Sequence, residues 1–328
     1  MLRLVLPLLL SLLAVTADAR CRSTDYRDHL SDAQRAQFER TVASIPFATG
    51  NHWIATKGNR RLHLIGTMHT GDRRMGPIMR RLRPVIANAD AVLLEITAHQ
   101  AQQSFDDFEL FRKYMLLPRG QSLSKMMSPA SWAALSRHLG RQGMDPRALD
   151  RLQPWYASEL LDQSSCVSIR PQIRSRGLDD RIEQIARRSR VPIGSLETVG
   201  QSLDSLLAMP KRDHVRLMEL ELARQQSGNE LYNALDDAYF EEAIGDILVM
   251  SRWSLYTDYN ASRGELDRLY NNLTQALLNR RNRNWMPVIL RTQGNNIVVA
   301  VGAAHLPGRE GLLNLLKKRG YSLQRAQF

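Results

Sequence analysis

The stretch HWIATKGNRRLHLIGTMH, residues 52–69, decides the fold class of this chain. Apolar and polar residues alternate on both sides of Gly58-Asn59, which predicts two antiparallel strands joined by a tight turn. A helical pattern follows over residues 77–88, and then the apolar run DAVLLEI over residues 90–96. A continuous apolar run is typical of a strand buried on both faces. Strand, helix and strand in this order predict a βαβ unit.

The rest of the chain combines further α/β segments with two long helical blocks. The α/β segments are strands at 191–198, at 295–305 and after Gly320, with helices at 179–190 and 308–320. Helical spacing dominates over about 100–165 and 202–285 instead. Within the second block the expected helices cover 202–208, 211–226, 229–250 and 263–284. Because the strands lie early, midway and late, we expect a single domain over residues 20–328: an α/β fold with a mixed sheet core and two large helical insertions.

The first residues have the order of a secretory signal peptide. Arg3 gives a basic start, an apolar run extends from Leu4 to Val15, and Ala17-Asp18-Ala19 is a small-residue cleavage site. The run is shorter than the roughly 20 residues that a membrane span needs. We expect residues 1–19 to be cleaved near Ala19, which leaves a periplasmic or secreted chain without a transmembrane span. A lipidated Cys21 and an uncleaved anchor are the alternatives.

Two cysteines, Cys21 and Cys166, are present. An even number of cysteines in an exported protein favours a disulfide between them, with two unpaired thiols as the alternative.

The chain is strongly basic, with 45 Lys+Arg against 33 Asp+Glu and a net charge of +12. In a cytosolic protein this charge would favour nucleic-acid binding. Export argues against that partner, and the sequence has no basic stripe interleaved with aromatic residues. We interpret the charge as a solvated basic surface. The sequence does not define an oligomeric state.

Two G-x-x-H motifs, Gly66 to His69 and Gly302 to His305, end two strand patterns that lie far apart in the chain. In open α/β sheets, sites form where the strands end at the carboxyl edge. Glycine there lets the backbone turn and lets another group approach closely. Neutral imidazole is both a metal ligand and a general base. Two histidines at matching positions predict one shared site.

Two glutamates, Glu95 and Glu197, end the strand patterns AVLLE and IGSLE. A buried carboxylate needs a partner, and two histidines with one or two glutamates suit a divalent metal that activates water or polarises a carbonyl. Asp179 begins a helical pattern, where an N-cap is the simplest interpretation and a site role is a further one. The arginines of RRNRNW, residues 280–285, are suited to clamp an anion, or to the last turn of a helix.

Several common catalytic motifs are absent from the sequence. It has no G-x-S-x-G, no H-E-x-x-H, no P-loop and no G-x-G-x-x-G after a strand pattern. The serine hydrolase, zincin and nucleotide-binding interpretations therefore lose their usual support.

The segments LHLIGTMH, ADAVLLEI, GLDDRI with VPIGSLET, RRNRNW and VVAVGAAHLPGREGLLNLLKKRGY resemble, in this order, the TraB/GumN family over roughly residues 45–325. The resemblance implies a core related to erythromycin-esterase-like and ChaN-like folds. The animal Tiki members are metal-dependent proteases with two G-x-x-H motifs, a glutamate and an arginine. By motif these residues correspond to His69, His305, Glu95 and Arg281 in this sequence, and Glu197 corresponds to the family's L-E-T glutamate.

We therefore expect a metal-dependent hydrolase of the cell envelope that acts on a peptide or another small acyl substrate. His69, Glu95 and His305 are expected to hold Mn²⁺, Co²⁺ or Zn²⁺. Glu197 is expected to act as general base or further ligand, and Arg281 to stabilise an oxyanion. Two non-catalytic alternatives remain open. One is a pocket for haem or a peptide, since ChaN-like relatives hold haem, and the other is an accessory protein of polysaccharide export.

Overall fold

The computed structural model describes residues 25–105, 107–161, 177–223 and 229–328. The predicted signal peptide, Cys21 and Cys166 lie outside these ranges. Within them, no helix combines the length and the apolar character that crossing a bilayer requires.

Six strands form one mixed sheet in the order β4-β3-β5-β2-β1-β6. They are β1 (His52–Lys57), β2 (Arg60–Thr67), β3 (Ala91–Leu94), β4 (Ile193–Ser195), β5 (Asn296–Gly302) and β6 (Ser322–Arg325). Strands β4, β3, β5 and β2 run parallel, whereas β1 is the antiparallel hairpin partner of β2 and pairs with β6 at its other side. The predicted α/β class and the hairpin are confirmed. The carboxyl ends of β2, β3, β4 and β5 meet at one edge.

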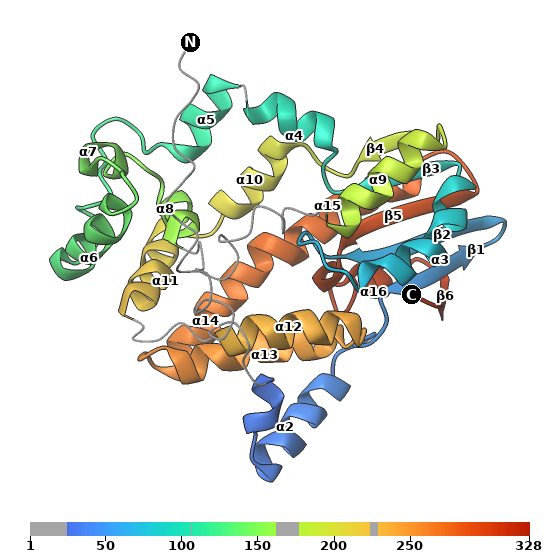
Figure 1. Ribbon diagram of the computed structural model, residues 1–328, viewed down its shortest axis with the longest axis horizontal. Helices are drawn as coiled ribbons and strands as arrows, with labels where there is room; N and C mark the ends of the chain where they lie inside the picture. Colours follow the sequence, from blue (N-terminus) through green and yellow to red (C-terminus); the bar gives the residue numbers. More distant parts are fainter. Residues whose placement is uncertain (1–24, 106, 162–176, 224–228) are drawn as a thin grey trace, which may run out of the picture.

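Helices cover both faces of this sheet (Figure 1). On one face, α3 (Met75–Ala87) and α9 (Leu178–Arg188) pack over Ile65 and Val298. On the other, α15 (Arg280–Arg291) and α16 (Leu312–Lys317) pack over Leu64 and Val299. Neighbouring strand residues thus point to opposite faces and both faces are buried, which explains the continuous apolar runs. Each such buried side chain contributes about 1.5–3 kcal/mol.

The two helical blocks lie mostly to the left of the sheet in Figure 1 and form smaller cores of their own. The first comprises α4 (Ala98–Phe105), α5 (Phe108–Met115), α6 (Pro129–Gly140), α7 (Pro146–Leu149) and α8 (Pro154–Leu161). The second comprises α10 (Val199–Leu207), α11 (Lys211–Ala223), α12 (Asn229–Phe240), α13 (Ile244–Asp258) and α14 (Arg263–Thr274). The 3₁₀ turn η1 (Tyr26–His29) and α2 (Asp32–Ala43) precede the sheet. The single-domain boundary and the erythromycin-esterase/ChaN-like analogy stay predictions.

Two predicted helices have different limits in the structure. The expected helix 229–250 is broken into α12 and α13 at Glu242, whose φ is +57°. This left-handed residue is held by tertiary contacts, because its Oε2 accepts from the Asn51 N–H and pairs with Arg325. The expected helix 308–320 is reduced to α16, since Gly308 adopts a φ of +96°. Helical periodicity reports neither kind of break.

A third helix has a π turn inside it. The expected helix 263–284 is α14, then the π-helical turn η3 (Gln275–Asn279), then α15, so the helical run continues to Arg291. The RRNRNW segment therefore lies inside this run and not in its last turn, and the helix-dipole interpretation of its arginines is wrong. Single π turns inside helices are frequent at functional sites.

A buried histidine pair between β1 and β2 predicts acid sensitivity. His52 Nε2 lies 3.1 Å from His63 Nδ1, and burial lowers the pKa of His63 from 6.5 to about 4. Between these two values the unfolded chain binds a proton that the folded chain does not, so stability falls as the pH drops from 6.5 towards 4. For His63 alone we expect a loss of about 2 kcal/mol between pH 7 and pH 5.

Urea unfolding of the wild type and of His63→Gln at the two pH values measures this loss. The variant should lose about 2 kcal/mol less than the wild type, whereas His138→Gln on α6 should behave like the wild type. An equal loss in His63→Gln and the wild type would assign the acid sensitivity to other groups.

Candidate functional site

The residues that the sequence predicted for the site lie at the carboxyl edge of the sheet. His69 follows β2, Glu95 follows β3, Glu197 follows β4, and His305 lies in the 3₁₀ turn η4 (Ala303–His305) after β5. They come together because these four strands are parallel. The opening turn of α15 adds Arg281.

Arg281 lies between the two glutamates. Its Nη2 is 2.6 Å from Glu95 Oε2 and 2.7 Å from Glu197 Oε1, and its Nε donates to the same Glu197 oxygen at 2.8 Å. The side chains of Arg281, Glu95 and Glu197 are 12%, 15% and 3% exposed. Ion pairs of this kind, with hydrogen bonds to charged groups and little water around them, are strong. The predicted carboxylates and arginine thus form one connected cluster.

The other oxygen of each glutamate is also engaged. Glu197 Oε2 accepts from Trp285 Nε1 at 3.0 Å, and Glu95 Oε1 accepts from the Gly302 N–H at 2.6 Å. Burial alone would raise the pKa of Glu95, but the Arg281 guanidinium and the Gly302 N–H favour the carboxylate and the pKa is lowered overall. Glu95 is therefore an ionised carboxylate at neutral pH.

Asn282 sets the tautomer of His305. The Asn282 amide nitrogen donates to the Glu310 carbonyl at 2.9 Å, so its Oδ1 is free to accept from the His305 Nδ1–H at 2.6 Å. The lone pair of the imidazole is therefore on Nε2, which lies 3.7 Å from Glu95 Oε1 and 3.4 Å from Arg281 Nη1. Burial, opposed by Glu95 and assisted by Arg281, lowers the pKa of His305 to about 3. His305 is a neutral imidazole.

His69 is held differently. Its Nδ1 lies 3.3 Å from Asp179 Oδ2, and its side chain is 68% exposed, against 4% for His305. The hydrogen bond to Asp179 raises the pKa of His69, and the charge of Glu95 adds to this increase. Asp179 Oδ1 is buried without a hydrogen-bond partner in the described part of the chain. The N-cap of α9 is Gly177, so the N-cap interpretation of Asp179 is wrong: this carboxylate faces His69.

The glycines of the two G-x-x-H motifs permit a close approach. A Cβ on Gly66 would lie 3.0 Å from Ala303 Cα, and one on Gly302 would lie 3.3 Å from Glu95 Oε1. Each glycine therefore leaves room for a group from the other half of the site, as the sequence predicted.

Gly177 supports the His69 loop through an even closer contact. A Cβ there would lie 2.5 Å from the His69 carbonyl oxygen, and the adjacent Leu178 N–H donates to the Met68 carbonyl at 2.9 Å. Because the clash would be with backbone, Gly177→Ala is expected to lower the free energy of unfolding by about 1–3 kcal/mol. Gly140→Ala is the matched control, since a Cβ there meets nothing within 4 Å. Equal urea midpoints for the two variants would contradict this packing argument.

The donor chemistry of the cluster fits a divalent cation. With His305 neutral, the carboxylates of Glu95, Glu197 and Asp179 and the guanidinium of Arg281 give a net charge of −2 when His69 is neutral and of −1 when His69, whose pKa is raised by Asp179, is protonated. The distance of 3.7 Å between His305 Nε2 and Glu95 Oε1 is shorter than one metal–nitrogen plus one metal–oxygen bond, about 4 Å, so one ion can contact both. Across the described ranges, no three His, Cys, Asp or Glu side chains already lie close enough to share an ion.

Two contributors to the site were not predicted individually, although RRNRNW contains both. Asn282 orients His305, and Trp285 binds Glu197 and stacks on the His305 ring with centroids 4.4 Å apart. Arg281 and Trp285 are i and i+4 and so share a helix face. This spacing was the available signal for Trp285.

The part of the chain that matches known proteins includes the whole sheet and the candidate site. The model of the TraB/PrgY/gumN family matches residues 51–325, which include all six strands and every residue of the cluster. The uncharacterized protein YbaP of Escherichia coli K12 is 24% identical over 276 residues, which are 82% of this chain and 94% of that protein. YbaP of Shigella flexneri matches with the same identity and coverage.

Proposed function

Because this chain belongs to the TraB/PrgY/gumN family over its entire sheet, we propose that the carboxyl edge of the sheet is the site of a metal-dependent hydrolase. The state of His305 carries the proposal. A buried imidazole is fixed as the tautomer with its lone pair on Nε2, which lies 3.7 Å from an ionised carboxylate and 3.4 Å from the Arg281 Nη1 donor. Neutral imidazole and carboxylate are preferred ligands of Zn²⁺ and of the neighbouring divalent ions.

His305, Glu95 and His69 would hold the ion in this proposal. When bound, a divalent metal polarises a carbonyl and makes a water molecule more acidic. Each histidine has a partner on Nδ1, Asn282 for His305 and Asp179 for His69. Such partners place the lone pair on Nε2 and strengthen the ligand.

Arg281 and Glu197 support this ligand set. Burial lowers the pKa of His305 and the Arg281 charge adds to this effect, whereas at Glu95 the same charge opposes burial and helps to lower the pKa, so that at physiological pH His305 is neutral and Glu95 ionised. It is also the nearest positive charge for a developing oxyanion. Both oxygens of Glu197 are engaged, by Arg281 and by Trp285, which favours a positioning role over the general-base role expected from the sequence.

We propose a peptide or another small acyl compound as the substrate. If the N-terminus is a cleaved signal peptide, the protein would bind this substrate in the periplasm or outside the cell. The net negative charge of the cluster favours the cation, while the exposed His69 side keeps the ligand set open to solvent. Metal-dependent hydrolysis at this site would require both the bound ion and this access.

The experiment compares the purified protein before and after treatment with a chelator. Calorimetry should show one equivalent of Zn²⁺, Mn²⁺ or Co²⁺ bound, and a peptide library should be cleaved only by the metal-loaded protein. Cleavage that survives complete metal removal would contradict the proposal, as would the absence of saturable metal binding. A haem absorbance band that persists through purification would favour the haem-binding alternative instead.

A further inference from the structure

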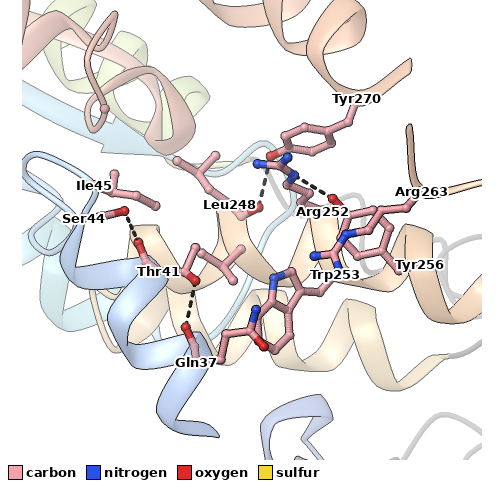
Figure 2. Close-up of a pocket in the computed structure, with 12 residues that line it drawn as sticks. Gln37, Thr41, Ser44, Ile45, Leu248, Arg252, Trp253, Tyr256, Arg263 and Tyr270 are labelled. Atoms are coloured by element: carbon pink, nitrogen blue, oxygen red, sulfur yellow. Dashed lines mark hydrogen bonds between the residues drawn. The ribbon is translucent and has the colours of Figure 1, made fainter. Parts of the chain in front are cut away.

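A groove with aromatic and basic walls lies outside the metal site. It is bounded by α2, α13, α14 and the loop after His305, and its volume is about 400 Å³. Figure 2 shows Arg252, Trp253 and Arg263 on one side of it and Gln37 and Thr41 of α2 on the other. The Gly308 N–H donates to the Pro46 carbonyl at 2.8 Å and joins the His305 loop to the segment after α2.

The groove continues towards His305. A second hollow of about 190 Å³ shares Leu248, Tyr270 and Gly308 with the first, and its lining also includes Asn282 and Ala304. Asn282 is the residue that binds His305 Nδ1, and Ala304 precedes His305 in the chain. A ligand along the groove would thus lie against the loop and the amide that hold the buried histidine.

The two arginines of the groove differ in their electrostatic state. Arg252 is neutralised, because its Nη2 is 2.5 Å from Asp267 Oδ1 and its Nε contacts the Tyr256 hydroxyl at 2.9 Å. The Arg263 guanidinium instead lies over the Tyr256 ring at 4.7 Å, and none of the described residues forms an ion pair with it. Arg252, Arg263 and Asp267, whose pKa the Tyr256 hydroxyl and both arginines lower, together leave one net positive charge at the rim of the groove, and the Arg263 guanidinium is fixed by an aromatic ring.

The rest of the wall combines apolar surface with unused donors. Trp253 packs edge-on against Phe38 at 5.5 Å, and within the part of the chain that the structure describes its indole N–H has no acceptor. Tyr270 is fixed by its hydroxyl, which donates to the Leu248 carbonyl at 3.0 Å. Fixed aromatic walls with free donors match a ligand that has an apolar or aromatic body and an acceptor group.

We propose that this groove binds a carboxylate attached to an aromatic or large apolar group, the chemistry of a peptide C-terminus with such a last side chain. The Arg263 guanidinium binds the carboxylate, and Trp253 and Tyr270 contact the apolar group. The proposal does not depend on metal binding or hydrolysis, because the groove contains none of the proposed metal ligands and its occupancy can be measured without turnover.

The test is calorimetric titration of the metal-free protein with three probes. N-acetyl-phenylalanine has both the carboxylate and the aromatic group. N-acetyl-phenylalanine amide has the aromatic group without the carboxylate, and glucuronate has a carboxylate without an aromatic group. N-acetyl-phenylalanine should bind at least about tenfold more tightly than either of the others, because a hydrogen bond to a charged group and the apolar contact are each lost in one of them. Equal binding of the amide would overturn the anion site, and tighter binding of glucuronate would assign the groove to an acidic saccharide.

Arg263→Gln should weaken N-acetyl-phenylalanine at least about tenfold and leave the amide unchanged. The residue is exposed at the start of α14, and unchanged thermal unfolding confirms that the variant is folded. Arg137→Gln, an exposed arginine on α6, is the matched control and should bind like the wild type. Unchanged affinity in Arg263→Gln, or no saturable binding to the wild type, would overturn the proposal.

Discussion

Arg281→Met should lower the free energy of unfolding by about 3–5 kcal/mol, the largest effect expected of any single substitution in this site. The variant retains the volume and the apolar stem of the side chain but removes the only cation within ion-pair distance of the Glu95 and Glu197 side chains among the described residues. Two carboxylates that are 15% and 3% exposed would then face each other without compensation. Urea unfolding at pH 7 measures the loss.

The pH dependence distinguishes this cause from a general packing defect. Without Arg281, the folded-state pKa of Glu95 should rise above its unfolded value, since burial and a neighbouring carboxylate both disfavour the charge. Protonation then relieves the repulsion, so the difference between variant and wild type should shrink as the pH falls through that raised pKa.

Arg283→Met is the matched control. Arg283 lies two residues further along the same helix and pairs with Glu310 at 2.7 Å, but the two side chains are 48% and 36% exposed. An exposed pair of this kind contributes about 0–1 kcal/mol. If the two substitutions cost the same, the buried cluster does not depend on Arg281 in the way described.

His305→Ala is expected to lower the affinity for Zn²⁺ about 100-fold or more, because it removes the one buried neutral imidazole beside Glu95. Asn282→Ala should lower it by about 10–100-fold through the loss of the Nδ1 partner. Asn282→Asp retains the acceptor, so it should restore much of the affinity. Titration calorimetry gives the dissociation constants, and circular dichroism checks the fold.

The control for this series is a histidine of the same chemistry outside the cluster. His138 lies on α6. Among the described residues, its side chain forms a hydrogen bond with the Gln142 side chain and with no other. His138→Ala should bind Zn²⁺ like the wild type. Equal affinities for His305→Ala and His138→Ala would exclude His305 as a ligand and leave the site without its fixed donor.

Local patterns predicted the sheet well because its central strands β2, β3 and β5 are largely buried, whereas β1 is only partly buried and alternates. The alternation around Gly58-Asn59 and the run at residues 90–96 required no tertiary information, and the parallel strands then placed both G-x-x-H motifs at one edge. The break at Glu242 depends on contacts with Asn51 and Arg325, which lie far away in the sequence. Periodicity cannot report a positive φ that distant contacts stabilise.

The sequence identified the residues of the site more readily than the role of each residue. Asp179 has the position of an N-cap, and only the path of the β2 loop shows that it faces His69. Glu197 has the pattern of a free strand-end carboxylate, but both of its oxygens are engaged by residues from α15. The side-chain type was visible in the sequence, whereas the partner that determines its chemistry was set by the fold.

The position of β5 has a consequence for how the protein is made. This strand is the fifth in the chain but lies between β2 and β3 in the sheet, and the loop after it provides His305. A nascent chain that stops before residue 296 has two apolar strands without their shared neighbour, and exposed strand edges of this kind pair with other chains. Assembly of the sheet and of the candidate site therefore needs nearly the last part of the polypeptide, and a product that ends before residue 296 lacks both β5 and His305.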